Sequence, residues 1–266
     1  MGLGILLIGE SGTGKSTSIR NFKKEDVAII NVAAKPLPFR GSYETFISDN
    51  YREIKNFLRK TTKKSIVIDD AQYLMANEFM RRATEKGFDK FTEIAQNYWD
   101  LIQEIRRLPE DVIVYFLTHI ERDANGNEKA KTIGKLLDEK ITLEGMFTVV
   151  LKTNVKDGVY SFSTQNSGYD TVKSPMGLFD STMIPNDLKL VDNAIRNYYE
   201  FTPVATAPVV EEVVEEVEVK TMAETIAEET EPPAPRKRGD SFKDKVEAFA
   251  ATTEESATPR RRRRVE

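Results

Sequence analysis

An octapeptide near the N-terminus, Gly9-Glu10-Ser11-Gly12-Thr13-Gly14-Lys15-Ser16, satisfies the pattern G-x-x-x-x-G-K-[ST] at every fixed position. It follows the apolar run Gly4–Ile8 and leads into a segment, about residues 15–22, that we expect to be helical. Glycines let the backbone curl until its N–H groups converge on phosphate oxygens, and a helix start adds a favourable dipole. In this context the pattern predicts a phosphate-binding loop, and a chance match is the alternative.

Within such a loop, Lys15 is expected to reach the β- and γ-phosphates of a nucleotide, and Ser16 to bind Mg²⁺. All residues from Gly9 to Thr17 are therefore candidate nucleotide contacts, and we expect the Lys15 side chain to be exposed. The segment Asn154-Val155-Lys156-Asp157 is similar to the guanine-specific N-K-x-D pattern, but its lysine does not directly follow the asparagine. The expected cofactors are consequently ATP rather than GTP, and Mg²⁺.

A second motif is acidic. Asp69 and Asp70 follow one another at the end of the apolar run Ile66-Val67-Ile68. An acid at the end of a buried strand beside a phosphate loop commonly holds the Mg²⁺ hydration shell, and we assign Asp69 to that role. Asp70 is a candidate for activating water, although its side chain is one methylene shorter than the glutamate often found there. The alternative for Asp70 is a solvated strand end.

The only histidine, His119, directly follows Thr118 at the predicted end of the apolar run 111–118. Both residues are candidates for sensing the γ-phosphate, and the alternative is a loop histidine that makes an ordinary hydrogen bond. The chain has no cysteine, which excludes disulfides and a His/Cys zinc site.

Lysines in two later polar segments could contact anions. Lys131 and Lys135 could reach the γ-phosphate of a neighbouring subunit, as a positive finger does in other systems. Lys173 could contact DNA phosphate. In each case the alternative is a solvated surface loop.

The hydrophobic pattern predicts alternating strands and helices, hence an α/β fold with a mostly parallel sheet covered by helices on both faces. A hairpin turning at Asp157-Gly158 is also expected. The predicted strands are 4–8, 26–32, 65–69, 111–118 and 147–152, the hairpin is 155–163, and the helices are 15–22, 47–60, 88–105 and 187–199.

Composition changes after Phe201, which divides the chain into a globular part, 1–201, and an acidic tail, 202–266. The globular part is neutral, so the tail carries the whole net charge of −4. Low aromatic content and abundant Val, Glu, Thr, Ala and Pro predict a disordered tail, with a short amphipathic helix at about 240–251. Its last basic cluster, Arg260–Arg264, is a candidate anion-binding element or a solvated end. No run suits a signal peptide or a membrane span, so a cytoplasmic location is expected.

Six segments are considered together: Gly9–Ser16, Asp69-Asp70, Leu117-Thr118-His119, 131–135, 145–148 and 173–177. With them, the chain resembles the phage-encoded RecA-like AAA ATPases over about residues 3–200. That resemblance implies a RecA-like P-loop NTPase fold, ATP hydrolysis, and action on single-stranded DNA beside a single-strand-binding protein. It also implies a homo-oligomer in the cytoplasm of a bacterial host.

Three functions remain open on the sequence. The first is an ATP-dependent motor in phage DNA recombination or replication. The second is a helicase-loader-type accessory ATPase, and the third is a regulatory nucleotide-binding module with little turnover. A kinase of small metabolites is a weaker fourth, since no arginine-rich lid is visible.

Overall fold

The computed structural model describes residues 1–201 of the chain. The expected tail at 202–266, its helix at 240–251 and the Arg260–Arg264 cluster lie outside the described residues.

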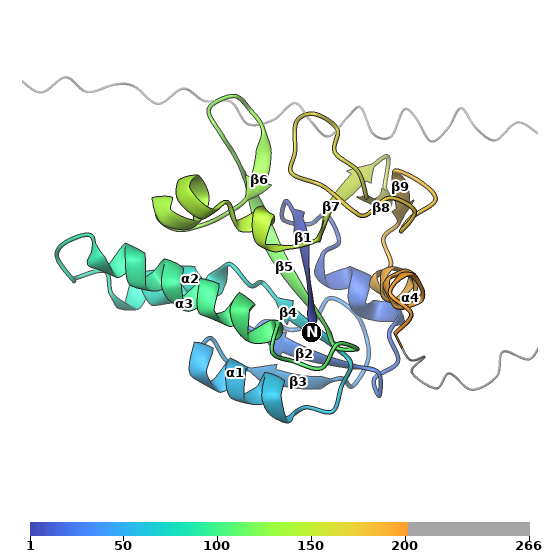
Figure 1. The fold of residues 1–266 in the computed structure, drawn as a ribbon, viewed down its shortest axis with the longest axis horizontal. Helices are drawn as coiled ribbons and strands as arrows, with labels where there is room; N and C mark the ends of the chain where they lie inside the picture. Colours follow the sequence, from blue (N-terminus) through green and yellow to red (C-terminus); the bar gives the residue numbers. More distant parts are fainter. Residues whose placement is uncertain (202–266) are drawn as a thin grey trace, which may run out of the picture. The chain divides into compact units, whose positions relative to one another are not determined.

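The described residues form a mixed α/β fold built on one mainly parallel sheet, as the sequence predicts (Figure 1). The strand order is β3-β2-β4-β5-β1-β7-β8-β9, and β6 pairs with β5 beyond this path. The first six strands of this order run parallel, whereas β8, β9 and β6 join in antiparallel pairs. The strands are β1 (Leu3–Gly9), β2 (Val27–Asn31), β3 (Glu44–Ile47), β4 (Ser65–Asp69), β5 (Ile113–Arg122), β6 (Glu128–Ala130), β7 (Val149–Lys156), β8 (Val159–Ser163) and β9 (Met183–Pro185).

Strand β1 lies in the middle of the sheet and is buried on both faces. Its alternate residues enter two different hydrophobic clusters, Leu6 and Ile8 on one face and Ile5 and Leu7 on the other, because side chains alternate along a strand. Helices α1, α2 and α3 cover the first face, and η1 and α4 cover the second (Figure 1). The helices are η1 (Ser16–Asn21), α1 (Tyr51–Lys60), α2 (Tyr73–Arg81), α3 (Asp89–Ile105), η2 (Leu136–Ile141), η3 (Leu143–Met146) and α4 (Leu188–Tyr198).

The expected helix at 47–60 is wrong at its start. Residues Glu44–Ile47 form the edge strand β3, and the helix begins only at Tyr51. Asn50 explains this boundary, because its side chain accepts hydrogen bonds from the backbone N–H groups of Arg52 and Glu53 and so caps the helix.

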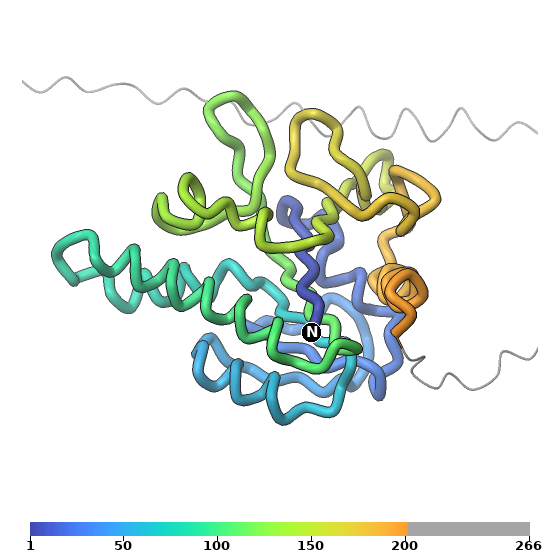
Figure 2. The backbone as a smooth tube through the Cα atoms, viewed as in Figure 1, coloured from blue at the N-terminus to red at the C-terminus, as the bar shows by residue number. Residues whose placement is uncertain are grey.

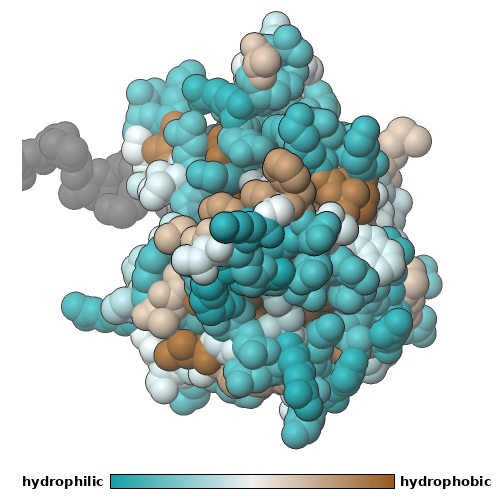
Figure 3. Space-filling model, turned by 90° about the vertical axis from the view of Figure 1, so that its left-hand side faces the viewer, coloured by the Kyte–Doolittle hydropathy of each residue, from teal (hydrophilic) through white to brown (hydrophobic). Residues whose placement is uncertain are grey.

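Sequence reasoning missed α2 and misplaced one residue of α3. Helix α2 is short and begins three residues after Asp70, so its pattern merges with the preceding strand. Phe88, the first residue of the expected helix at 88–105, precedes α3 and is 85% exposed. The ends of α2 and α3 extend away from the sheet in the backbone trace of Figure 2. Figure 3 shows this side of the molecule, where hydrophilic side chains predominate around separate hydrophobic patches.

The predicted hairpin is confirmed as β7 and β8, and Asp157 and Gly158 connect them. Both turn residues have positive φ angles, 52° and 76°, as tight hairpin turns of this kind require. This hairpin and β9 extend the sheet beyond the phosphate loop. Within residues 1–201, no helix is long and apolar enough to cross a membrane.

Candidate functional site

The carboxyl ends of four parallel strands bring the candidate residues together. Gly9 at the end of β1 is in register with His119 of β5, and Asn31 at the end of β2 is in register with Asp69 of β4. Strand β5 continues past the expected end at Thr118 to Arg122, because β6 pairs with its last residues. His119 therefore belongs to a strand and not to the loop after it. Ligands of open α/β sheets bind at this edge.

The loop from Gly9 to Ser16 passes close to neighbouring chain segments, so glycine is needed at positions 9 and 14. A Cβ at Gly9 would lie 1.8 Å from Thr153 Oγ1 of β7. Gly14 has a φ angle of 92°, and a Cβ there would lie 2.9 Å from Tyr160 Cδ1 and 3.1 Å from Asn186 Nδ2. The loop is thus held against β7 and β8 in a conformation that side chains would block.

Lys15 is folded back over this loop. Its Nζ donates to the carbonyl oxygens of Gly9 at 2.9 Å and Glu10 at 2.7 Å, and the residue is only 6% exposed. The expectation of an exposed Lys15 is therefore wrong, because the curled loop offers its ammonium two carbonyl acceptors. Burial lowers the pKa of Lys15 to about 8, and the nearby carboxylates Asp70 and Asp69 partly oppose that shift.

Ser16 and Asp69 meet at the centre of the site. Ser16 Oγ donates to Asp69 Oδ1 at 2.8 Å, and Asp69 is 7% exposed. Burial raises the pKa of Asp69 to about 6, although the hydrogen bond from Ser16 favours the charged form. These two oxygens are hard ligands of the kind that Mg²⁺ prefers, and their meeting beside a phosphate loop fits that ion.

Asp70 is paired with two groups, one from strand β5 and one from the loop after β2. His119 Nε2 lies 3.5 Å from Asp70 Oδ1, and Lys35 Nζ lies 2.8 Å from Asp70 Oδ2. The hydrogen bond to His119 and then the Lys35 ammonium lower the pKa of Asp70 to about 2, against the effect of burial. Asp70 has a φ angle of 58°, which aspartate tolerates better than most residues. Its charge and orientation are consequently fixed.

Gln72 holds the end of β5 through hydrogen bonds. Its Oε1 accepts from Thr118 Oγ1 at 3.3 Å and from the backbone N–H of His119 at 3.0 Å, and the side chain is buried. Thr118 is fully buried and does not line the cavity, whereas His119 does. Gln72 therefore positions the strand that presents His119.

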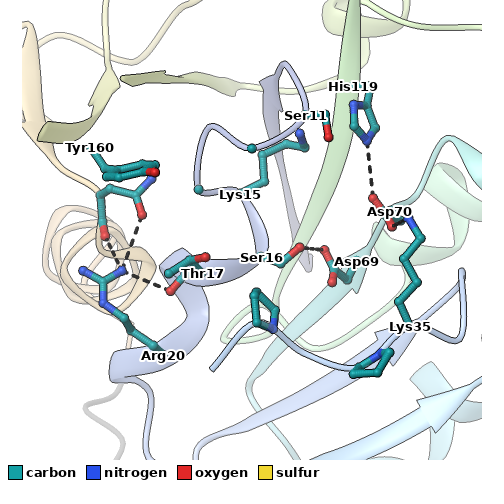
Figure 4. A pocket seen from close by; sticks show the side chains of 15 residues that line it. Ser11, Lys15, Ser16, Thr17, Arg20, Lys35, Asp69, Asp70, His119 and Tyr160 are labelled. Carbon is teal, nitrogen blue, oxygen red and sulfur yellow. Dashed lines mark hydrogen bonds and ion pairs between the residues drawn. The ribbon is translucent and has the colours of Figure 1, made fainter. Parts of the chain in front are cut away.

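Three further side chains lie on the opposite side of the loop. Arg20 of η1 donates from Nη1 to the carbonyl oxygens of Thr17 at 3.0 Å and Asn186 at 2.9 Å. Tyr160 of β8 is 47% exposed, and Asn186, between β9 and α4, is 3% exposed. Figure 4 shows Arg20 and Tyr160 across the loop from Asp69, Asp70, His119 and Lys35.

Most of these side chains surround one cavity of about 480 Å³ (Figure 4), whereas Gln72 and Thr118 lie outside its lining. Within residues 1–201, no group of three or more His, Asp or Glu side chains could hold a metal ion by itself. A cation bound at Ser16 and Asp69 would therefore complete its shell with ligand and water oxygens. The lining residues are Ser11, Gly12, Gly14, Lys15, Ser16, Thr17, Arg20, Lys35, Pro36, Pro38, Asp69, Asp70, His119, Tyr160 and Asn186.

Other candidates from the sequence lie apart from this cavity. Glu10 and Thr13 line a neighbouring depression, where Glu10 pairs with Arg122. Lys131 is exposed just after β6, and Lys135 is 83% exposed and pairs with Glu139 within the same helical segment. Lys173 is half-buried, and its backbone pairs with Val150 of β7. The structure thus leaves these lysines outside the cavity of their own chain.

Sequence reasoning missed Lys35, Gln72, Arg20, Tyr160 and Asn186. Lys35 and Gln72 carried a weak signal, since each closely follows a predicted strand whose end must lie at the carboxyl edge of the sheet. The other three carried none, because the helix η1, the hairpin and the turn before α4 meet only in three dimensions.

A parallel sheet, a glycine-rich loop at the end of its central strand and a hydrogen-bonded Ser–Asp pair define a P-loop nucleotide-binding domain. Residues 1–177 match the AAA domain family, and the chain belongs to that family. A search of curated proteins finds no match for the chain.

Proposed function

We propose that the chain binds MgATP in the cavity at the carboxyl edge of the sheet and hydrolyses it. The hydrogen bond between Ser16 Oγ and Asp69 Oδ1 at 2.8 Å carries this proposal. It brings the metal-binding hydroxyl of the loop to the acid of β4, which is the arrangement that positions Mg²⁺ in P-loop NTPases. Membership of the AAA domain family supports ATPase chemistry in general.

In this proposal the chain's own residues bind and orient the triphosphate. Backbone N–H groups of the loop hold the phosphates, and Lys15 leaves the carbonyls of Gly9 and Glu10 for the β- and γ-oxygens. Mg²⁺, when bound by Ser16 and Asp69, would neutralise charge on the phosphates. Water attacks from the side of Asp70 and His119, which lie together at the same end of the cavity.

Asp70 is the proposed group that orients this water. Its pKa of about 2 makes it a weak proton acceptor while Lys35 and His119 contact it. It becomes a better acceptor once Lys35 moves to another anion, and the γ-phosphate is the nearest one that the reaction supplies. Asp70 and His119 together are therefore the proposed catalytic pair beside Lys15 and Asp69.

We further propose that the chain acts in phage DNA recombination or replication, on single-stranded DNA and beside a single-strand-binding protein. The support is the resemblance to RecA-like phage AAA ATPases over residues 3–200. In the proposed homo-oligomer, the exposed Lys131 or Lys135 approaches a neighbour's nucleotide, and Lys173 is the proposed DNA contact. A helicase-loader function and a regulatory module with little turnover are the alternatives.

ATPase assays of the full chain, with and without single-stranded DNA, test both levels of this proposal. Stimulation by DNA supports the DNA-directed motor, stimulation only by a helicase supports the loader, and slow turnover under all conditions supports the regulatory module. Lys15→Ala should lower turnover by roughly 10²–10³-fold with the fold retained, because it removes a charge aimed at the transferred phosphoryl group. Wild-type turnover in this variant, with an unchanged melting curve, would contradict ATP hydrolysis at this site.

A further inference from the structure

The cavity has a second wall that the proposed hydrolysis does not use. It consists of Tyr160 and Asn186, which converge on Gly14 from β8 and from the turn before α4. Tyr160 lies across the loop from Asp69 and Asp70 (Figure 4). A triphosphate held by this loop places its γ end toward the metal-binding pair, so its nucleoside end leaves toward the opposite side.

Asn186 carries a hydrogen-bond donor that nothing in the described part of the chain uses. Its Nδ2 is buried and has no partner among residues 1–201, although the residue lines the cavity. The orientation of the amide is fixed, because Arg20 Nη1 lies 2.9 Å from Asn186 O and 3.5 Å from Asn186 Oδ1. The oxygen therefore faces Arg20 and the nitrogen faces Gly14, where an unsatisfied buried donor is unfavourable unless a ligand supplies an acceptor.

Tyr160 supplies an aromatic surface at the same place. The residue is 47% exposed, and its Cδ1 would be 2.9 Å from a Cβ at Gly14, so the ring rests on the loop beside Asn186. The backbone N–H of Asn186 donates to Tyr160 O at 3.3 Å, which keeps the two residues together. An exposed ring next to a fixed, unpaired donor suits a flat heteroaromatic ligand with an acceptor at its edge.

We propose that Tyr160 and Asn186 form the base subsite of the nucleotide site, and that they select purine nucleotides. The purine ring packs on Tyr160, and Asn186 Nδ2 donates to a ring nitrogen such as N7. Arg20 acts as a positioning residue, since it holds the Asn186 amide in the donating orientation. This inference rests on the proposed function, because it assumes that the loop binds the triphosphate.

Parallel binding of MgATP and of inorganic tripolyphosphate with Mg²⁺ tests the subsite, since tripolyphosphate has no base. Tyr160→Ala should raise the dissociation constant for ATP about tenfold, within the range for aromatic–base stacking, and leave that for tripolyphosphate within about twofold. Tyr160→Phe, which keeps the ring, should restore most of the lost affinity. Asn186→Ala should act in the same direction, and the preference of the wild type for ATP and GTP over CTP and UTP should shrink in Tyr160→Ala.

Tyr169→Ala is the matched control, because Tyr169 is 72% exposed and lies outside the cavity lining. The subsite is overturned if Tyr160→Ala changes the affinities for ATP and tripolyphosphate by the same factor, or changes neither. A wild-type chain that binds neither ligand, or a Lys15→Ala variant that binds both normally, would instead overturn the proposed nucleotide site as a whole.

Discussion

The Lys35 ammonium lies 2.8 Å from Asp70 Oδ2, so a cation from the loop after β2 is paired with the acid that follows β4. Both residues line the cavity, and the Lys35 side chain is 60% exposed. This pair raises the pKa of Lys35 and contributes to the low pKa of Asp70. Lys35 therefore provides a positive charge within the chain's own cavity, besides that of Lys15. The exposed lysines proposed to act on a neighbour are a separate source of charge.

Replacing Lys35 should separate these two sources of charge. If Lys35 moves from Asp70 to the γ-phosphate, Lys35→Met removes a charge that stabilises the transition state, and turnover should fall by ~10²-fold with little change in melting temperature. Lys86→Met is a matched control, because Lys86 is exposed between α2 and α3. Steady-state ATPase rates at saturating MgATP provide the measurement.

Lys135→Ala tests the other source of positive charge, a lysine from the neighbouring subunit. A trans role for Lys135 requires that the variant lose DNA-stimulated turnover and keep ATP binding, because its charge would reach only the adjacent subunit. Mixing Lys135→Ala with Lys15→Ala subunits should then recover part of the activity. A rate that is independent of protein concentration, with no recovery on mixing and a strong Lys35→Met defect, would assign the positive charge to Lys35 in the same chain.

Asp69 should lower the free energy of unfolding at neutral pH, because burial raises its pKa to about 6 from an unfolded value of 3.8. Between these two pH values the folded chain binds more protons than the unfolded chain, so the contribution of Asp69 to the free energy of unfolding falls as pH rises. Above pH 6 this contribution has its full destabilising value. Asp69→Asn keeps an acceptor for Ser16 and should be more stable than the parent at pH 8 by roughly 3 kcal/mol. Most of this difference should disappear at pH 4.

Urea unfolding in nucleotide-free and Mg²⁺-free buffer at pH 8 and pH 4 measures this effect. Asp180→Asn is the matched control, because Asp180 is exposed. An Asp69→Asn variant less stable than its parent at pH 8 would contradict the predicted cost of the buried charge.

A buried ionic network joins the sheet to α4 and should be essential for folding. Asp192 is fully buried and accepts from Ser65 Oγ at 2.7 Å, Tyr115 OH at 2.9 Å and Arg196 Nε at 2.9 Å. Asp192→Ala should destabilise the fold by ~3–5 kcal/mol, because it leaves the Arg196 charge buried without its partner. Denaturant unfolding measures this, with Asp180→Ala as control, and a loss below ~1 kcal/mol would show that the network relaxes.

The local sequence predicted the strands and helices where the hydrophobic pattern was clear and the boundary residues were distinctive. The strand Ser65–Asp69 and the hairpin turn at Asp157-Gly158 are examples. The predicted boundary was wrong at Asn50, where a side-chain cap sets the start of α1. Helix α2 was not predicted, because it is short and closely follows a strand. In both places the competing structure depends on only a few residues, so periodicity carries little signal.

By itself, the sequence determined the phosphate loop and the acid at the end of β4. Gly9, Gly14, Lys15 and Ser16 lie in one short segment, and the chemistry of that segment follows from its own backbone and from its position between a strand and a helix. Only the tertiary structure decided which groups face this loop. The strand order brings Lys35 and His119 to Asp70, and it brings Tyr160 and Asn186 to Gly14, because the carboxyl ends of strands distant in sequence meet at one edge of a parallel sheet.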